Sequence, residues 1–86
     1  MTLVYYYVPE DKDDPDFPNV FGVPYSKTAL QLKHIYESFP LRGSYIFRFK
    51  YNDHGSPVWL DLPDVNSKIP LYNDRLIIKA TRTSWN

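Results

Sequence analysis

The sequence contains no cysteine and only three glycines among its 86 residues. Without cysteine there are no disulfides, no thiolate metal ligands and no cysteine nucleophile, and the chain is compatible with a reducing compartment. The glycines stand far apart, so there is no glycine-rich loop of the kind that cradles phosphates. Apolar runs of roughly 18 residues, the length of a membrane span, are also absent. We therefore expect a cytoplasmic chain with no membrane span and no cofactor.

An excess of charge of either sign is lacking as well. Ten Lys and Arg residues balance ten Asp and Glu residues, which argues against a basic nucleic-acid-binding module. The charges are nevertheless segregated, because residues 1–25 carry a net charge of −4, residues 26–52 carry +4 and residues 53–86 sum to zero. These blocks are either two solvated faces or complementary poles that steer copies of the domain onto one another.

Aromatic residues are plentiful, and 8 Tyr, 5 Phe and 2 Trp make up 17% of the chain. A chain of this length allows one domain, residues 1–86, whose core we place at about residues 3–81. Because so short a chain buries only a little over ~60% of its unfolded surface, large rings must supply much of the core. An active-site cleft is hard to accommodate in such a core, and we expect no enzyme.

Alternating and β-branched patterns predict five strands. The clearest is 45–51, whose aromatic residues at odd positions share the face toward the core. Pro57 stands at the start of the fourth strand, which indicates a sheet edge or a strand end because proline donates no ladder hydrogen bond. Residues 82–86 are expected to fray. The predicted strands are residues 2–8, 19–23, 45–51, 58–62 and 76–81, and an exposed acidic loop, 9–18, joins the first two.

One helix is predicted between the second and third strands, where Thr28 and Gln31 have the spacing of a capping box. Pro40 ends it. The resulting order, ββαβββ, predicts an α+β fold of the ubiquitin-like roll type, with one helix packed on a mixed five-stranded sheet. The helix is expected to bury the apolar residues at helical spacing, which are Leu32, Ile35, Tyr36 and Phe39.

Three arrangements suggest chemistry, and none fits its motif. The acidic run at 11–16 lacks the glycine and the glutamate that a calcium-binding loop requires at fixed positions. His34 and His54 are too far apart in sequence for a self-evident zinc site, so structural or surface roles are expected. Ser44, His54 and Asp61 resemble a hydrolase triad in composition only, without a nucleophile-elbow sequence. We predict no catalytic residue and no metal site.

The predicted sheet itself offers a function. Unpaired backbone on edge strands is available to another chain, which can add a strand to the sheet. Association is therefore the activity that the residues favour.

Six blocks of the sequence resemble the DIX domain, which is shared by dishevelled, axin and the coiled-coil DIX proteins of Wnt signalling. The resemblance spans about residues 3–81, and residues 64–77 look most like dishevelled. The blocks are YYY at 5–7, VFGVP at 20–24, TALQLK at 28–33, GSYIFRFK at 43–50, DHG at 53–55 and DVNSKIPLYNDRLI at 64–77.

This resemblance implies a ubiquitin-like fold and a non-enzymatic, self-associating scaffold in Wnt/β-catenin signalling. It further implies a cytoplasmic head-to-tail polymer in which the second strand of one copy pairs with the fourth strand of the next. The implied partners are the domain itself and other DIX domains, such as those of axin or dishevelled. The implied head residues are Asn19, Val20, Phe21 and Gly22, and the implied tail residues are Val58, Trp59, Leu60 and Asp61.

The head and the tail each depart from the family pattern. Asn19 stands where dishevelled proteins have an aromatic residue, and Pro57 and Trp59 stand where the family has an aliphatic and a basic residue. The tail thus loses one main-chain donor and gains a ring. Trp59 is either a core residue or, if Val58 and Leu60 point inward, an outward anchor. The alternative function is a ubiquitin-like or PB1-like adaptor that forms a one-to-one complex with another protein.

Overall fold

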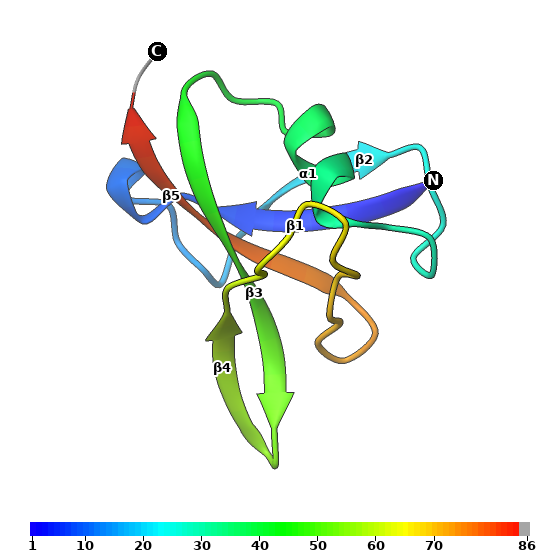
Figure 1. The fold of residues 1–86 in the computed structure, drawn as a ribbon. Coiled ribbons are helices and arrows are strands. Elements are labelled where there is room, and N and C mark those ends of the chain that lie inside the picture. The colour runs from blue at the N-terminus through cyan, green and yellow to red at the C-terminus, as the bar shows by residue number, and fades with distance from the viewer. Residues whose placement is uncertain (85–86) are drawn as a thin grey trace.

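The computed structural model describes residues 1–84 and consists of one helix on one face of a five-stranded sheet (Figure 1). The strand order is β2-β1-β5-β3-β4, with β1 parallel to β5 and all other neighbours antiparallel. The predicted α+β architecture, a ubiquitin-like roll, is confirmed. The elements are β1 (Thr2–Tyr7), a 3-10 turn η1 (Pro9–Asp11), β2 (Asn19–Val23), α1 (Leu32–Ser38), β3 (Ser44–Asp53), β4 (Ser56–Leu60) and β5 (Leu76–Ser84).

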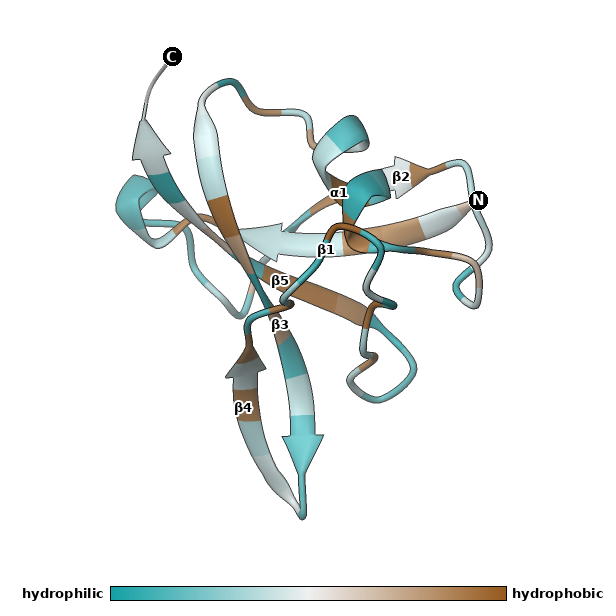
Figure 2. Cartoon of the chain, in the orientation of Figure 1, coloured by the Kyte–Doolittle hydropathy of each residue, from teal (hydrophilic) through white to brown (hydrophobic). Residues whose placement is uncertain are grey.

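The core lies between α1 and the three central strands. Alternate residues of each central strand face the helix, as on β3, where Tyr45, Phe47 and Phe49 are buried. Figure 2 shows the hydrophobic parts of β1, β5 and β3 gathered beneath α1. The helix contributes Leu32 and Ile35 to this layer. Each fully buried aliphatic or aromatic side chain stabilises the fold by about 1.5–3 kcal/mol relative to exposure.

The helix begins later than the sequence predicts. Gln31 is the N-cap and is extended, with φ −126° and ψ 164°, because it forms a bridge with Lys68. Nδ1 of His34 accepts a hydrogen bond of 3.0 Å from the Gln31 N–H. The prediction that Thr28 caps the helix is therefore wrong, since the chain stays irregular until Gln31 and the cap forms one turn further on.

Two aromatic residues expected in the core are not buried. Tyr36 is 50% exposed, because its ring packs on Phe47 at the wall of a surface pocket, with centroids 4.9 Å apart, and its other side remains open. Tyr51 is 41% exposed, because the β3–β4 hairpin projects past the area that the helix covers (Figure 1). Alternation correctly assigned Tyr45, Phe47 and Phe49 to the core, and only the last ring of the strand, Tyr51, is exposed.

The last strand is longer than predicted. Residues 82–86 were expected to fray, whereas β5 continues through Ser84 and pairs there with β3. The Arg82 guanidinium forms an ion pair with Asp11 and donates a hydrogen bond of 2.7 Å to Oη of Tyr45. These contacts hold this end of β5 against η1 and β3. Trp85 and Asn86 lie outside the described residues.

A tight turn shifts β4 two residues toward the N-terminus of its predicted range. Residues 54–55 both have positive φ, 51° and 89°, as in the two-residue type I′ turns that join hairpins. The chain therefore returns at once, and Ser56 pairs with Asp53. Pro57 lies inside β4 at the edge of the sheet, in agreement with the sequence.

Candidate functional site

The two outer strands of the sheet are β2 and β4, at opposite edges (Figure 1). An outer strand pairs on one side only, so alternate residues direct their N–H and C=O groups away from the sheet. The four predicted head residues all lie on β2. Three of the predicted tail residues lie on β4, and Asp61 follows it directly. The structure thus brings each set together on its own edge and separates the two sets by the width of the sheet.

On β2, three of the four head residues are exposed, which are Asn19, Val20 and Gly22. Val20 is 51% exposed, and Gly22 is exposed on the sheet face opposite α1. A Cβ at Gly22 would lie 2.7 Å from Sδ of Met1, so the Met1 side chain covers the position that a larger residue would fill. Glycine within a strand also permits another backbone to approach closely.

The ring of Phe21 points into the core rather than outward. It packs edge-to-face on Tyr6 and Phe39, with ring centroids 5.6 and 5.7 Å apart. Phe21 therefore holds β2 against α1 and β1, while its main chain remains at the edge of the sheet. Sequence alternation alone did not assign Phe21 a face, because β2 is only five residues long.

Asn19 fastens the acidic loop to the start of β2. Its side-chain amide donates a hydrogen bond of 2.9 Å to Oδ2 of Asp13, and the Val8 N–H donates to the same oxygen at 3.1 Å. One carboxylate thus joins the end of β1 to the beginning of β2. Asn19 therefore has a local structural role at this position.

The turn between β3 and β4 determines which main-chain groups of the tail are free. The hydrogen bond that closes a type I′ turn joins the residues on either side of it, and hydrogen-bonded pairs then alternate with non-hydrogen-bonded pairs. The pairs Asn52–Pro57 and Lys50–Trp59 are therefore of the non-hydrogen-bonded kind. The main-chain groups of Pro57 and Trp59 point away from β3, and proline has no N–H to offer. Trp59 supplies the outward donor in the middle of β4.

The side chain of Trp59 lies on the sheet face opposite α1. Its ring is half-buried against Tyr7, with centroids 5.9 Å apart, and Nζ of Lys79 lies 4.8 Å from its centroid. Val58 and Leu60 are paired with Tyr51 and Phe49, which places them on the other face. Of the two interpretations that the sequence left open, the core one is excluded.

The end of β4 carries an ion pair. Nε of Arg48 lies 3.0 Å from Oδ1 of Asp61, and the Asp61 side chain is 70% exposed. Such an exposed pair contributes roughly 0–1 kcal/mol to stability. Its main effect is to hold the chain that leaves β4 against the neighbouring strand β3.

Electrostatic effects centre on the acidic loop before β2. Hydrogen bonding to Asp11 raises the pKa of the Arg82 guanidinium, which therefore stays charged. Burial, followed by the negative charge of Asp13, raises the pKa of the Tyr6 phenol above its ordinary value. The loop is thus a fixed negative region next to β2, while Arg48 and Lys50 stand on β3 beside β4.

No other chemical centre is formed among residues 1–84. No three His, Asp or Glu residues within this range come together as a metal site would require. His34 is buried and stacks on Tyr25 at 3.9 Å, which confirms its predicted structural role. Ser44 begins the extended strand β3 and His54 directly follows its other end, so the two cannot form a triad. Within the same range, no helix has the length and apolarity to cross a membrane.

The comparison with protein families decides what kind of domain carries these two edges. The model of the DIX domain family matches residues 1–80. The chain belongs to the DIX domain family. DIX domains are protein-interaction and oligomerisation domains of Wnt-signalling scaffolds, and the family is not enzymatic. A search of curated protein sequences finds no match to the chain.

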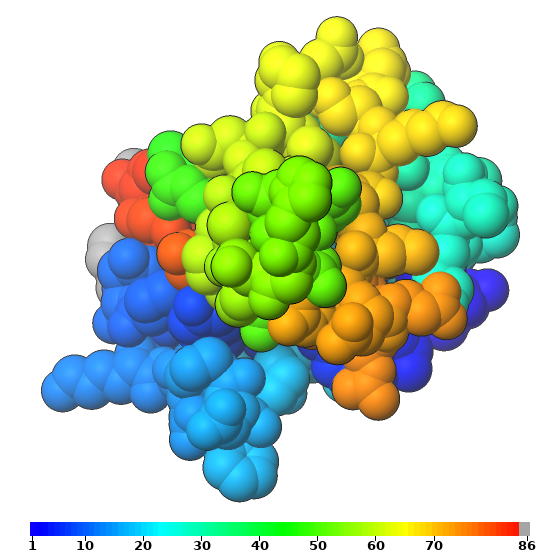
Figure 3. Space-filling model, turned by 90° about the horizontal axis from the view of Figure 1, so that it is seen from below, coloured from blue at the N-terminus to red at the C-terminus, as the bar shows by residue number. Residues whose placement is uncertain are grey.

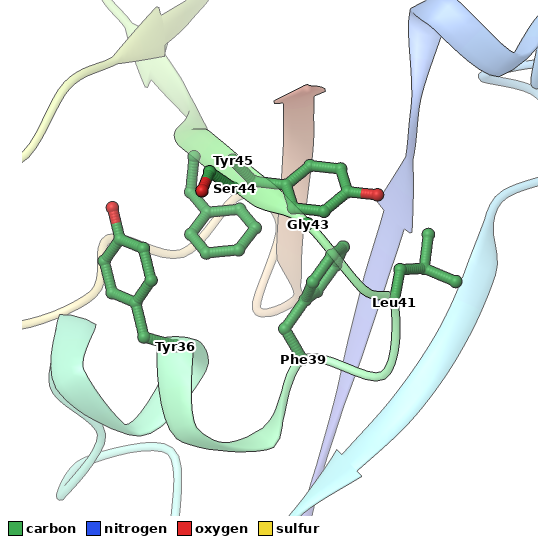
Figure 4. Close-up of a pocket in the computed structure, with 7 residues that line it drawn as sticks. Tyr36, Phe39, Leu41, Gly43, Ser44 and Tyr45 are labelled. Carbon is green, nitrogen blue, oxygen red and sulfur yellow. The ribbon is translucent and has the colours of Figure 1, made fainter. Parts of the chain in front are cut away.

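This DIX domain also has a surface pocket that the sequence did not reveal. It has a volume of about 250 Å³ and lies between the C-terminal end of α1 and the start of β3 (Figure 4). Helical spacing assigned both Tyr36 and Phe39 to the core. The sequence signal against this assignment is Pro40, which ends the helix soon after these residues and leaves Tyr36 exposed. The lining residues are Tyr36, Phe39, Leu41, Gly43, Ser44, Tyr45 and Phe47.

Proposed function

We propose that this DIX domain polymerises head to tail, with β2 of one copy pairing with β4 of the next. The head is Asn19–Gly22, and the tail is Val58–Asp61. The observation that carries the proposal is the sheet order, because the two strands that the family resemblance assigns to the contact are the two outer strands. A contact between two different surfaces of the same chain repeats without closing and generates a filament.

Strand direction supports the same arrangement. β2 is antiparallel to β1, and β4 is antiparallel to β3, so the outer strands run in opposite directions across the sheet. When a second copy continues the sheet with its helix on the same face, its β2 meets β4 of the first copy as an antiparallel neighbour. The outward N–H and C=O of Trp59 then find partners on β2.

The polymer acts as a scaffold of Wnt/β-catenin signalling in the cytoplasm. Each contact is weak, and multivalency at high local concentration supplies binding strength to the proteins that the scaffold carries. Copolymers form with related DIX domains, such as that of axin, through the same edges. Within the family the chain is most like dishevelled, on the residues at 64–77.

Sedimentation against concentration tests self-association. We expect the average mass to rise continuously with protein concentration, as an open polymer requires. A one-to-one adaptor, the alternative function of this fold, would instead remain monomeric up to near-millimolar protein and would form a complex of fixed stoichiometry with a different protein. A mass that stays monomeric, with no binding to an axin DIX domain, would contradict the proposal.

Two blocked variants test the direction of the contact. Val20→Asp places a charge on the exposed part of β2 and gives a head-blocked variant. Trp59→Asp places a charge at the half-buried centre of β4 and gives a tail-blocked variant. Each alone should sediment as a monomer. Mixed in equal amounts they should form a dimer, because each retains the edge that the other lacks. Thermal unfolding of each variant serves as the control for folding.

A further inference from the structure

The pocket at the end of α1 is open, aromatic and large enough for a ring. Tyr36 is 50% exposed and Leu41 is 36% exposed, while Phe39 forms the floor between them (Figure 4). An apolar cavity of ~150 Å³ suffices to bind benzene, and this pocket has about 250 Å³. The volume is therefore sufficient for a phenyl side chain.

One aromatic side chain of the acidic loop, Phe17, is almost fully exposed to solvent. Phe17 is 79% exposed in the acidic loop, immediately before β2. The loop segment is held in place, because the Phe17 N–H donates to the Asp14 carbonyl at 3.0 Å and the Asp16 N–H donates to the Asp14 carboxylate at 2.9 Å. Figure 3 shows the segment before β2 standing out from the body of the molecule. An ordered loop backbone reduces the conformational entropy that this segment loses when it is bound.

Strand direction places this ring and the pocket at the same end of the proposed contact. When β2 of one copy lies antiparallel to β4 of the next, the residues before β2 lie beside the chain that follows β4. β3 is antiparallel to β4 and begins at that same end, with Ser44 and Phe47 in the pocket wall. Phe17 precedes Asn19 by only two residues. In the proposed contact, the loop of one copy therefore lies beside the first half of β3 of the next copy, which β4 does not cover.

Charge favours the same placement. Asp14 and Asp16 shortly precede Phe17, and both are exposed. Arg42 is an exposed cation between two residues that line the pocket, whereas α1 carries both Lys33 and Glu37. The negative segment and Arg42 are complementary, which favours this register of the contact.

We propose that Phe17 of one copy inserts into the pocket of Tyr36, Phe39 and Leu41 on the next copy, with Asp16 beside Arg42. This inference rests on the proposed head-to-tail contact and adds a second anchor to it. Buried aromatic anchors of this kind carry a large share of the binding energy of an interface.

The dimer of blocked variants isolates one contact and tests the inference. In that dimer the tail-blocked variant supplies the head, so Phe17→Ala in it should weaken the dimer by about tenfold to thirtyfold. The same substitution in the head-blocked variant is the matched control and should leave the dissociation constant unchanged. Tyr36→Ala should show the reverse pattern, and the two substitutions made on opposite partners should be non-additive.

The outcomes distinguish the Phe17 contact from the head-to-tail edge contact on which it rests. If the dimer forms and Phe17→Ala has no effect in the tail-blocked variant, or the same effect in both variants, the Phe17 contact is wrong and the edge contact stands. If no dimer forms from the two blocked variants, the head-to-tail contact itself fails, and the inference fails with it.

Discussion

Pro57 lies opposite Asn52 in the β3–β4 ladder, at a pair whose main-chain groups on the β4 side face away from β3. Proline at this position costs the domain no internal hydrogen bond, because its missing N–H would have faced solvent. In the proposed head-to-tail contact, Pro57 offers the added strand one main-chain donor fewer, at no cost in hydrogen bonds to the fold itself.

Replacement of Pro57 by alanine should restore this donor and strengthen the polymer. One additional hydrogen bond of about 1 kcal/mol lowers the concentration at which the chain assembles by roughly fivefold. Sedimentation velocity over a concentration series measures the shift. Pro63→Ala is the matched control, since Pro63 is exposed and lies beyond the β3–β4 ladder. Equal shifts for the two variants would contradict the orientation assigned to Pro57.

Phe21 should behave as a core residue despite its place on the head strand. Phe21→Ala removes the edge-to-face contacts with Tyr6 and Phe39 and should lower the free energy of unfolding by roughly 2–3 kcal/mol. Urea unfolding at a concentration where the chain is monomeric measures this. Val20→Ala, on the neighbouring exposed residue, should cost less than about 0.5 kcal/mol. Similar losses for the two variants would show that the Phe21 ring is not held by the core.

Alkaline pH should destabilise the domain through Tyr6. Burial and Asp13 raise the pKa of Tyr6 above its ordinary value of 10.0, so the unfolded chain releases this proton first. The contribution of Tyr6 is fully present below pH ~10 and is lost as the pH rises toward the folded-state pKa. Urea titrations between pH 8 and 11 should show a decline in stability above pH ~10, and the decline should be smaller in Tyr6→Phe. Parallel declines in the two proteins would rule out Tyr6 as its source.

The sequence predicted the fold well because its strongest signals are local and repeated. Alternation over 45–51 identified β3, and the ββαβββ order restricted the topology to a few arrangements. The prediction of the helix start was wrong because the extended conformation of Gln31 depends on Lys68, which is distant in the sequence. The predicted end of β5 was wrong for the same reason, since Arg82 forms an ion pair with Asp11 and a hydrogen bond with Tyr45, and both are distant in the sequence.

The structure places the predicted head and tail residues on or next to the two outer strands, and the sequence did not predict the directions of their side chains. The resemblance placed the head and tail on the two outer strands, yet no local pattern shows that Phe21 turns inward or that Trp59 rests on Tyr7 and Lys79. Both depend on contacts between strands that the chain order separates. The pocket beside Tyr36 depends on where the helix ends relative to β3, and a periodic pattern carries no information on that distance.

Amide hydrogen exchange at Trp59 tests the central claim most directly. In the monomer the main-chain N–H of Trp59 faces solvent, and in a head-to-tail polymer it donates to β2 of the next copy. Exchange measured in the polymer and in the monomeric tail-intact variant Val20→Asp should therefore show strong protection of Trp59, and of alternate residues of Asn19–Val23, in the polymer only. If the Trp59 amide exchanges equally fast in both, the edges of this sheet do not join one copy to the next.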